Sequence, residues 1–289
     1  MYKQIDSNKR KTFALMFLFV LIISGLVWAW TQYYGNSQYI FVAVFISAII
    51  SLFSFYSGDK VALWQAGAKE IQKSDNPYVW RLVENLSITA GLPMPKIYII
   101  NDSAMNAFAT GRDPKRASIA LTTGIVNHLE NEELEGVIAH ELSHIKNYDI
   151  RLMMIVIICI GVITLLADWL LRSFIWRGRG NDNNKGGILI IVAIVLGILS
   201  PLFARLIQMA VSRKREYLAD ASGVLLTRYP EGLARALEKI SSQNQPLRRA
   251  NKATAHLYIS SPFRGKKASK LFSTHPPIQD RIKALRTMA

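Results

Sequence analysis

The chain has 289 residues and a formal net charge of +15; 51% of its residues are hydrophobic and only 19% are charged. This length allows one or two domains, and this composition fits either a large apolar core or a membrane protein. A positive net charge suits binding to nucleic acid or to anionic lipid. The sequence lacks an aromatic-basic module, so we expect no nucleic-acid partner. Its single cysteine, Cys159, excludes an internal disulfide and a cysteine zinc site.

Two apolar runs near the N-terminus predict a membrane hairpin. The first run, residues 12–30, follows a basic tail, is as long as a spanning helix and has no small-residue cleavage site after it. A short uncharged loop leads to the second run, residues 39–56. We therefore expect residues 1–58 to form an N-terminal transmembrane hairpin. Because basic flanks stay inside, the chain after Gly58 should face the cytoplasm.

Residues 59–150 are soluble in character and predict a region of mixed helices and strands. The spacing of apolar residues predicts a helix over residues 60–73, which leaves the membrane. Asn76, followed by a proline, is a natural start for a second helix, and Gly91 ends it. A third helix is predicted over residues 131–147, because an asparagine and acidic residues at its start favour a helix N-terminus.

Two short β-rich runs in the same region predict strands. They are residues 96–100 and residues 117–122, and turn residues separate them from their neighbours. Together with the segment 104–110 that lies between them, they predict a small sheet that contains a hairpin. We therefore expect an α+β fold that is mainly α-helical.

The helix over residues 131–147 carries a His-Glu-x-x-His motif. Residues four apart share a helix face, so His140 and His144 can bind the same metal ion. Glu141, next to the first histidine, can then address a water on that metal. This spacing is typical of the zinc helix of metalloproteases. The alternative is a chance match on a surface helix, and the rest of the chain must supply a third ligand to disfavour it.

Two more apolar runs, residues 152–171 and 187–211, follow the metal motif almost directly. Both are long enough to span a bilayer, so residues 151–211 are predicted to be a second transmembrane pair. The link between them, residues 172–185, is basic, and full spanning would place it outside, against the positive-inside rule. Partial embedding of this pair is therefore the alternative.

A third metal ligand is expected after this pair, in residues 212–289. Glu216 and Asp220 are four apart and share a helix face. A catalytic zinc takes three protein ligands and keeps one open position, and His-His-Glu is one of the known sets. Glu216 is therefore predicted as the third ligand, and Asp220 as the acceptor of a ring N–H from a ligand histidine. The alternative is a charged surface face with ion pairs to Arg213 or Lys214.

Four motifs occur in a fixed order among the four apolar runs. They are Asn-Ala-Phe-Ala-Thr-Gly-Arg at residues 106–112, the metal motif at 140–144, Ser-Arg-Lys-Arg-Glu-Tyr-Leu-Ala-Asp at 212–220 and Thr-His-Pro-Pro at 274–277. By these motifs and their order, the chain resembles the HtpX-type membrane-embedded zinc metalloproteases, which are relatives of the CAAX prenyl proteases. The resemblance covers nearly the whole chain.

The resemblance implies a zinc-dependent endopeptidase of the cytoplasmic membrane, with one Zn²⁺ per chain. It implies a multi-pass protein with its active site on the cytoplasmic side and a role in protein quality control under stress. The expected fold is a zincin-like metalloprotease domain with a small β-sheet, formed by residues 59–150 and 212–289 and built onto four transmembrane helices. The expected partners are membrane-protein or unfolded polypeptide substrates, the lipid bilayer and membrane partner proteins.

Three further residues are candidates for contacts with the substrate. Asn106, at the predicted substrate edge over residues 105–110, can hydrogen-bond an extended substrate or stabilise a turn. His275 lies in a loop that two prolines make rigid, and the resemblance implies that it points to the active site; it can stabilise an oxyanion or cap a loop. Arg213 can bind a substrate carboxylate or stabilise charge near zinc, or it can form a structural ion pair.

The predicted reaction is hydrolysis of a peptide bond by a water that zinc activates, with Glu141 as the general base. One alternative is a specific processing peptidase of the prenyl-protease type, which four spans rather than more disfavour. The other is a non-catalytic membrane scaffold that keeps the metal site. The intact Glu141 disfavours this scaffold, since a dead relative could lose the base without losing the metal.

Overall fold

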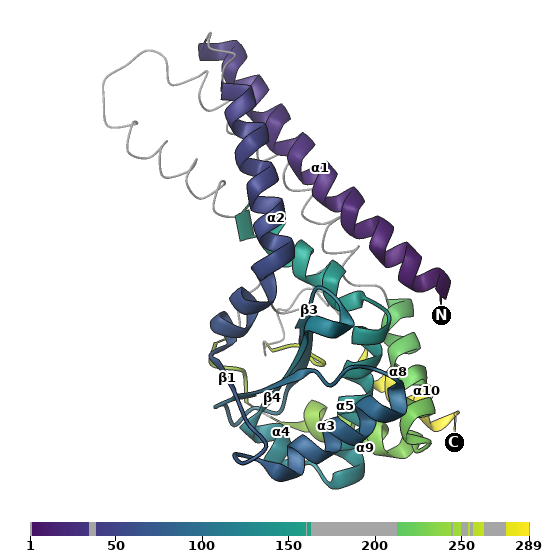
Figure 1. The fold of residues 1–289 in the computed structure, drawn as a ribbon. Coiled ribbons are helices and arrows are strands. Elements are labelled where there is room, and N and C mark those ends of the chain that lie inside the picture. Colours follow the sequence, from purple (N-terminus) through teal and green to yellow (C-terminus); the bar gives the residue numbers. More distant parts are fainter. Residues whose placement is uncertain are drawn as a thin grey trace.

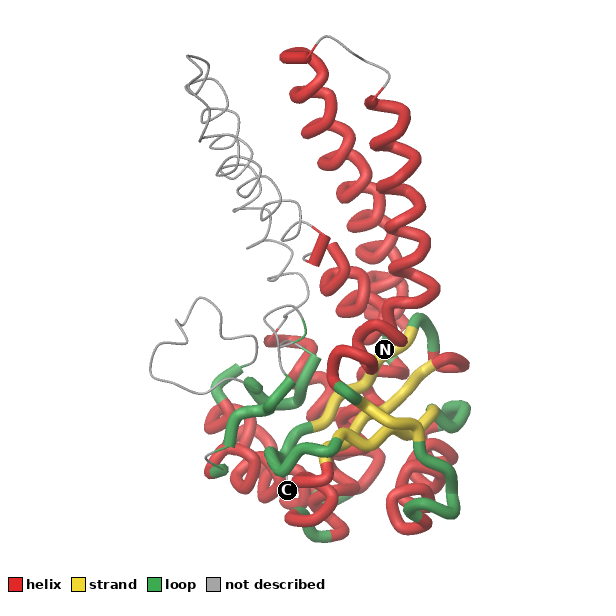
Figure 2. The backbone as a smooth tube through the Cα atoms, turned by 90° about the vertical axis from the view of Figure 1, so that its left-hand side faces the viewer, coloured by secondary structure: helices red, strands yellow, loops and turns green. Residues whose placement is uncertain are grey.

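The computed structural model has a body of short helices and one small sheet, from which two long helices extend side by side (Figures 1 and 2). Both views place the N-terminal end of the chain at the junction between this helical extension and the body. The structure describes residues 2–34, 39–159, 161–162, 213–243, 245–249, 254, 257–262 and 276–288.

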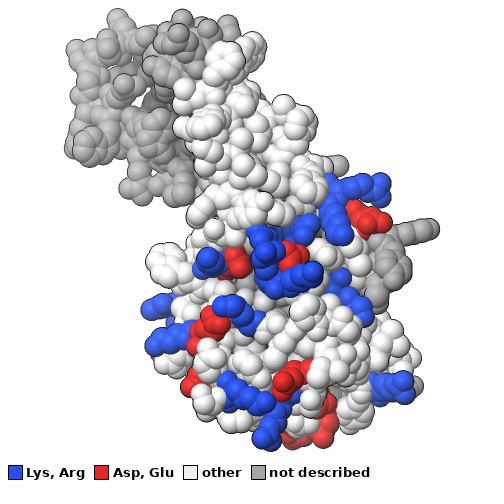
Figure 3. Space-filling view, viewed as in Figure 1, with Lys and Arg blue, Asp and Glu red and all other residues white. Residues whose placement is uncertain are grey.

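The extension consists of α1 (Tyr2–Tyr34) and α2 (Tyr39–Ala66), which pack against each other. Among the described residues, only the stretch Ile40–Ala66 is a helix long and apolar enough to cross a membrane. Large apolar side chains on it are exposed, for example Phe41 at 79% and Phe45 at 67%. On the face seen in Figure 3, charged side chains gather over the body and its junction with the extension. The exposed apolar surface of α2 is typical of a helix that contacts lipid or another protein.

Helix α2 differs from the sequence prediction at its C-terminal end. It runs without a break past Tyr56 to Ala66. Gly67 then adopts a left-handed backbone (φ 67°), which ends the helix, and β1 (Ala68–Glu70) follows. The predicted helix over residues 60–73 is therefore wrong beyond Ala66. Three residues are too few to show an alternation pattern, and β1 forms because a neighbouring strand pairs with it.

A four-stranded mixed sheet has the order β1-β2-β4-β3. Its central strands, β2 (Lys96–Ile100) and β4 (Ala117–Thr122), are parallel neighbours. At one edge, β3 (Ala107–Gly111) pairs antiparallel with β4, and η1 (Pro114–Arg116) joins the two. Both predicted strands and the predicted hairpin are confirmed. Every residue of β3 and β4 is buried, so this half of the sheet lies in the core of the body, while β1 at the other edge is partly exposed.

Capping residues explain where two helices of the body begin and end. The Asn76 side chain accepts a backbone hydrogen bond of 3.0 Å from the first turn of α3 (Pro77–Ala90). Gly91 ends this helix in a left-handed conformation, as predicted. The Thr122 side chain accepts a similar bond and begins the short α4 (Thr123–His128) directly after β4.

Helix α5 (Asn131–Lys146) lies at the centre of the body and confirms the third predicted helix. It packs against α3, β3, α8 (Arg213–Thr227) and α9 (Pro230–Ser242), while α10 (Ile278–Arg286) packs against α8 and α9. Twelve of the 16 residues of α5 are buried. The metal motif therefore lies on a buried helix, which disfavours a chance match on a surface helix.

The prediction of four membrane spans falls partly outside the described residues. Of the third predicted span, residues 152–171, the structure describes 152–159 and 161–162, all of them helical. The fourth, residues 187–211, lies outside the described part. Two predicted domain boundaries, after Gly58 and after Ile150, fall inside continuous helices. The predicted membrane segments and the body therefore share helices at these two points.

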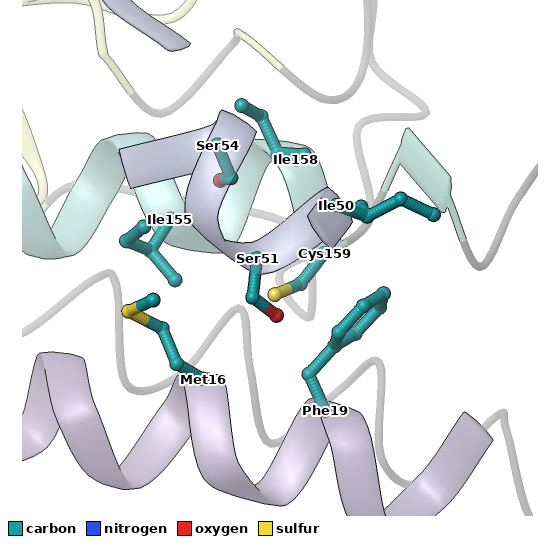
Figure 4. Close-up of a pocket in the computed structure, with 8 residues that line it drawn as sticks. All are labelled: Met16, Phe19, Ile50, Ser51, Ser54, Ile155, Ile158 and Cys159. Carbon is teal, nitrogen blue, oxygen red and sulfur yellow. The ribbon is translucent and has the colours of Figure 1, made fainter. Parts of the chain in front are cut away.

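The helix over residues 149–159 packs against the helical extension. Figure 4 shows a small pocket into which side chains from α1, from α2 and from this helix point. Met16 and Phe19 come from α1, and Ile155 and Cys159 come from the helix that follows the metal motif. The chain therefore passes from the metal motif directly into an apolar unit of three packed helices.

Candidate metal centre

Helices α5 and α8 bring the three predicted metal ligands together. His140 and His144 lie on one face of α5, and Glu216 comes from the first turn of α8. One nitrogen or oxygen atom of each lies within 4.8 Å of the other two, and all three residues are buried. Gly223 of α8 allows this close approach, because a Cβ there would lie only 3.1 Å from the backbone nitrogen of His140.

The distances between these atoms fit a metal ion. His140 Nε2 and His144 Nε2 are 3.2 Å apart, and oxygens of Glu216 lie 3.8 Å from the first and 3.7 Å from the second. Ligand atoms around a tetrahedral zinc are separated by roughly 3.3 Å, given bonds of about 2.0–2.1 Å. A buried carboxylate also needs a cation to offset its loss of water. Two imidazoles and one carboxylate are therefore a donor set that suits zinc.

The second nitrogen of each histidine ring faces a carboxylate. His140 Nδ1 lies 2.9 Å from Asp220 Oδ1, and His144 Nδ1 lies 3.0 Å from Asp149 Oδ2. A carboxylate can only accept, so each ring carries its proton on Nδ1 and keeps the Nε2 lone pair for a metal. This is the arrangement expected of Asp220.

Sequence reasoning missed Asp149. It lies five residues after His144, beyond the end of α5, and helical spacing alone does not bring it back to the motif. The backbone turns at Tyr148 and so brings Asp149 back toward His144. Tyr148 adopts a positive φ of 59°, which is uncommon for a residue other than glycine. The available signal was an acid just past the end of the metal helix. The strained turn thus positions a partner for His144.

A second missed residue, Arg281 of α10, is completely buried beside the metal ligands. Its guanidinium donates to both oxygens of Asp220, at 2.9 and 2.6 Å, and to the carbonyl oxygen of Ile259 at 3.2 Å. The nitrogen that donates to Ile259, Nη1, also lies 3.6 Å from Glu216 Oε2. A bidentate pair between arginine and a carboxylate fixes the plane of the carboxylate. Arg281 therefore holds Asp220 in the orientation in which Asp220 accepts from His140.

The buried charges stabilise one another. Burial would raise the pKa of Asp220, but the charge of Arg281 and hydrogen bonds from His140 and Arg281 hold this pKa well below its usual range. Burial would lower the pKa of His144, but the hydrogen bond to Asp149 and the charges of nearby carboxylates raise it to about 9. Carboxylates around the rings therefore favour a positive charge between them, which a metal ion would provide.

Glu141 lies in the same cavity as the three candidate ligands and is 1% exposed. Burial raises the pKa of its carboxyl group, while the charges of His140 and His144 and a backbone hydrogen bond from Ala109 oppose this rise. A carboxyl group with a raised pKa suits a base that takes a proton and returns it near neutral pH. The bond from Ala109 also places β3, an edge strand of the sheet, beside this carboxylate.

The segment over residues 257–262 covers part of the predicted substrate edge. Its first three residues line the cavity that holds the metal ligands. The backbone N–H of Ile259 donates to the carbonyl oxygen of Ala107 in β3 at 2.9 Å. The Asn106 side chain donates to the carbonyl oxygen of Ser260 at 3.0 Å and is buried. These bonds favour the turn-stabilising alternative for Asn106, whose role toward a substrate stays a prediction.

Comparison with known proteins decides the family. Residues 73–289 match peptidase family M48, and this range contains α5, α8 and every residue placed at the metal centre above. The chain belongs to peptidase family M48. The candidate metal centre is therefore that of a peptidase, and the predicted resemblance to HtpX-type proteases can be compared with individual M48 relatives.

Relatives along the whole chain confirm that resemblance. The chain is 46% identical to a protease HtpX homolog of Dictyoglomus thermophilum, over 99% of this chain and 94% of the relative. It is 45% identical to a protease HtpX homolog of Tropheryma whipplei, over 100% of this chain and 98% of the relative. The crystal structure of S. mikatae Ste24p shares the fold, with a TM-score of 0.53 at 19% identity, over 99% of this chain and 67% of that one.

One predicted site residue of this M48 peptidase, Arg213, is not brought into the centre, and another cannot be placed. Arg213 is exposed at the start of α8, so its role stays a prediction. His275 lies outside the described residues. The structure therefore places His140, Glu141, His144, Glu216 and Asp220 together, adds Asp149 and Arg281, and gives Arg213 no direct part in the cavity.

Proposed function

We propose that the chain is a membrane-bound zinc endopeptidase that cleaves misfolded or damaged membrane proteins at the cytoplasmic face of the cell membrane. The observation that carries this proposal is the position of Glu141 in one buried cavity with two histidines and a carboxylate of suitable spacing. Burying a further carboxylate that is not itself a ligand costs free energy. A non-catalytic scaffold would have no use for it, whereas a hydrolase needs a base at this place.

His140, His144 and Glu216 would hold the metal, one zinc per chain. When bound, the metal would lower the pKa of a water and polarise the scissile carbonyl. Asp220 and Asp149 each accept an N–H from one ligand ring, so both rings are held with Nε2 toward Glu216. Ligands fixed in advance need no reorganisation during the reaction.

Glu141 would take the proton of that water and pass it to the leaving amine. Its neighbour Ala109 belongs to β3, the edge strand of the sheet. An extended peptide that binds along this edge would bring its own carbonyl groups beside the base. Part of the edge is taken by Ile259, so a substrate would displace the segment over residues 257–262 or use the remaining length of β3.

The membrane location rests on the helical extension. Helix α2 has the length and apolar composition of a span, and its large side chains are exposed. The metal helix α5 is separated by only two residues from the helix over residues 149–159, which packs against α1 and α2. A site at this junction would lie at the membrane surface, within reach of loops and tails of membrane proteins. The basic N-terminal tail favours the cytoplasmic side.

Cleavage by the purified, detergent-solubilised protein distinguishes the proposed substrates. We expect faster cleavage of a destabilised membrane protein than of its stable parent, because only an unfolded segment can extend along β3. A chelator should abolish both reactions, and the fragments measured by mass spectrometry should have new ends in loops or tails. A prenylated peptide that ends in a CAAX sequence is the comparison substrate.

Two results would contradict this proposal. Cleavage of the prenylated peptide alone would favour a specific processing peptidase. Retention of zinc without cleavage of any of the three substrates would favour a scaffold that keeps the metal site.

A further inference from the structure

Asn8 lies in the basic N-terminal tail but is completely buried at the metal centre. Its side-chain nitrogen Nδ2 donates to Asp149 Oδ1 at 2.6 Å and to the carbonyl oxygen of Asn147 at 2.9 Å. These partners lie about 140 residues further along the chain. The N-terminal part of α1 therefore reaches Asn147 and Asp149, in the turn that follows the metal helix.

The direction of these bonds is fixed by chemistry. A carboxylate and a backbone carbonyl can only accept, so the Asn8 amide must present its NH₂ group to both. The other oxygen of Asp149, Oδ2, accepts from Nδ1 of His144 at 3.0 Å. Asn8, Asp149 and His144 therefore form one continuous chain of hydrogen bonds that ends on a metal ligand.

We propose that Asn8 is a positioning residue of the metal centre, which makes the first helix of the chain a part of that centre. A carboxylate that is held by one oxygen alone can rotate about its own bond. Asn8 holds the second oxygen of Asp149, so the plane of the carboxylate, and with it the ring of His144, is fixed. Because an amide is neutral, Asn8 does this without offsetting the negative charge of Asp149 that favours a metal.

Other contacts keep the start of α1 in this place. The Lys9 ammonium lies 4.6 Å from the centre of the Tyr148 ring, over the strained turn that precedes Asp149. Further along α1, Met16 and Phe19 pack beside the helix over residues 149–159 (Figure 4). The helix that carries Asn8 is thus attached on both sides of the turn that Asp149 belongs to.

Arg215 is a further group near Asp149, and it is charged, with its Nε atom 3.8 Å from Oδ1. It belongs to α8, next to Glu216, and its charge is shared between these two carboxylates. At this distance its attraction is less directional than the 2.6 Å bond from Asn8. The short bond from α1 therefore constrains the orientation of Asp149 more closely than this ion pair with α8 does.

The inference rests on the proposed zinc site, and its test uses zinc affinity with the full-length protein in detergent. Asn8→Leu has nearly the same shape and removes both donated bonds. Asn8→Asp keeps the size and places a second carboxylate against Asp149. Loss of a partner outside the ligand set typically weakens metal binding about 10–100-fold. For both variants we expect a zinc dissociation constant raised roughly tenfold, measured by competition with a chromophoric chelator.

Two further readouts separate positioning from folding. The visible absorption of the cobalt(II)-substituted protein should change in both Asn8 variants, since the ligand field depends on the orientation of His144. The matched control is Thr12→Val, which removes another fully buried polar group one turn further along α1. The Thr12 hydroxyl donates only within its own helix, to the carbonyl oxygen of Asn8. Thr12→Val should leave both zinc affinity and the cobalt spectrum unchanged.

Parent zinc affinity and an unchanged cobalt spectrum in the Asn8 variants would overturn the inference, even if the metal-free variants unfold at a lower temperature. An equal loss of affinity in Thr12→Val would also overturn it, because general packing of α1 would then explain the effect. If the parent protein itself binds no zinc, the proposed function fails instead, and the two failures are therefore distinguishable.

Discussion

Glu141→Gln is expected to keep the metal and to lose peptide cleavage by roughly 10²–10⁴-fold, the usual contribution of a general base. The amide has the same shape as the carboxylate but cannot accept a proton. Because Glu141 is not among the three candidate ligands, their spacing is unchanged. Zinc content per chain and the cleavage rate, measured on the same purified sample, test both halves of this prediction.

Glu132→Gln is the matched control for this experiment. Glu132 is an acid in the first turn of the same helix and is exposed to solvent, away from the cavity. It should retain both zinc and activity. Equal cleavage rates for the parent and for Glu141→Gln would show that Glu141 is not the general base, whatever the metal content.

Glu216→Ala is expected to lose most of its zinc. It removes one of three protein ligands and leaves two imidazoles that must hold the ion alone. Loss of an outer partner already weakens metal binding about 10–100-fold, so loss of a ligand should exceed this range. Metal analysis of the purified variant by mass spectrometry should give well under one zinc per chain, and cleavage should fall in proportion.

Lys214→Ala controls for the alternative interpretation of this helix. If Glu216 were part of a charged surface face, the removal of Lys214 would matter as much as the removal of Glu216. The structure has Lys214 exposed and Glu216 buried against the histidines, so Lys214→Ala should keep its zinc. A parent-like zinc content in Glu216→Ala would exclude Glu216 as a ligand.

The ligand set could be predicted because its information is local. His140 and His144 are one helical turn apart, and so are Glu216 and Asp220, so each pair shares a face as soon as a helix forms. The chemistry of these residue types then suggests that the two helices meet. Their meeting itself depends on packing, in which Gly223 allows the backbone of α8 to approach His140.

The residues that hold the ligands in place could not be predicted in the same way. Arg281 lies 61 residues from Asp220, and Asn8 lies 141 residues from Asp149. An arginine on a short terminal helix and an asparagine in a basic tail both have the pattern of solvent-exposed residues. Only the packing of α10 and α1 against the body shows that these two are buried.

The fold shows the same contrast between features that local sequence determines and features that depend on packing between distant segments. Asn76 and Gly91 mark the ends of α3 by local capping, and the sequence predicts both ends. Gly58 is the predicted end of a membrane segment, yet α2 continues through it. The structure gives the reason, since a Cβ at Gly58 would lie 2.7 Å from the Met154 side chain. This glycine permits the close approach of two helices, and its sequence context alone does not reveal that role.

Titration of zinc into metal-depleted protein tests the central claim most directly. The full-length protein would be stripped with a chelator, and cleavage of an unfolded membrane-protein substrate would be followed as zinc is returned. We expect no cleavage without metal and a rate that rises with bound zinc and saturates at one zinc per chain. Undiminished cleavage by the metal-free protein, or a rate that does not depend on bound zinc, would contradict the assignment of His140, His144 and Glu216 as a catalytic metal site.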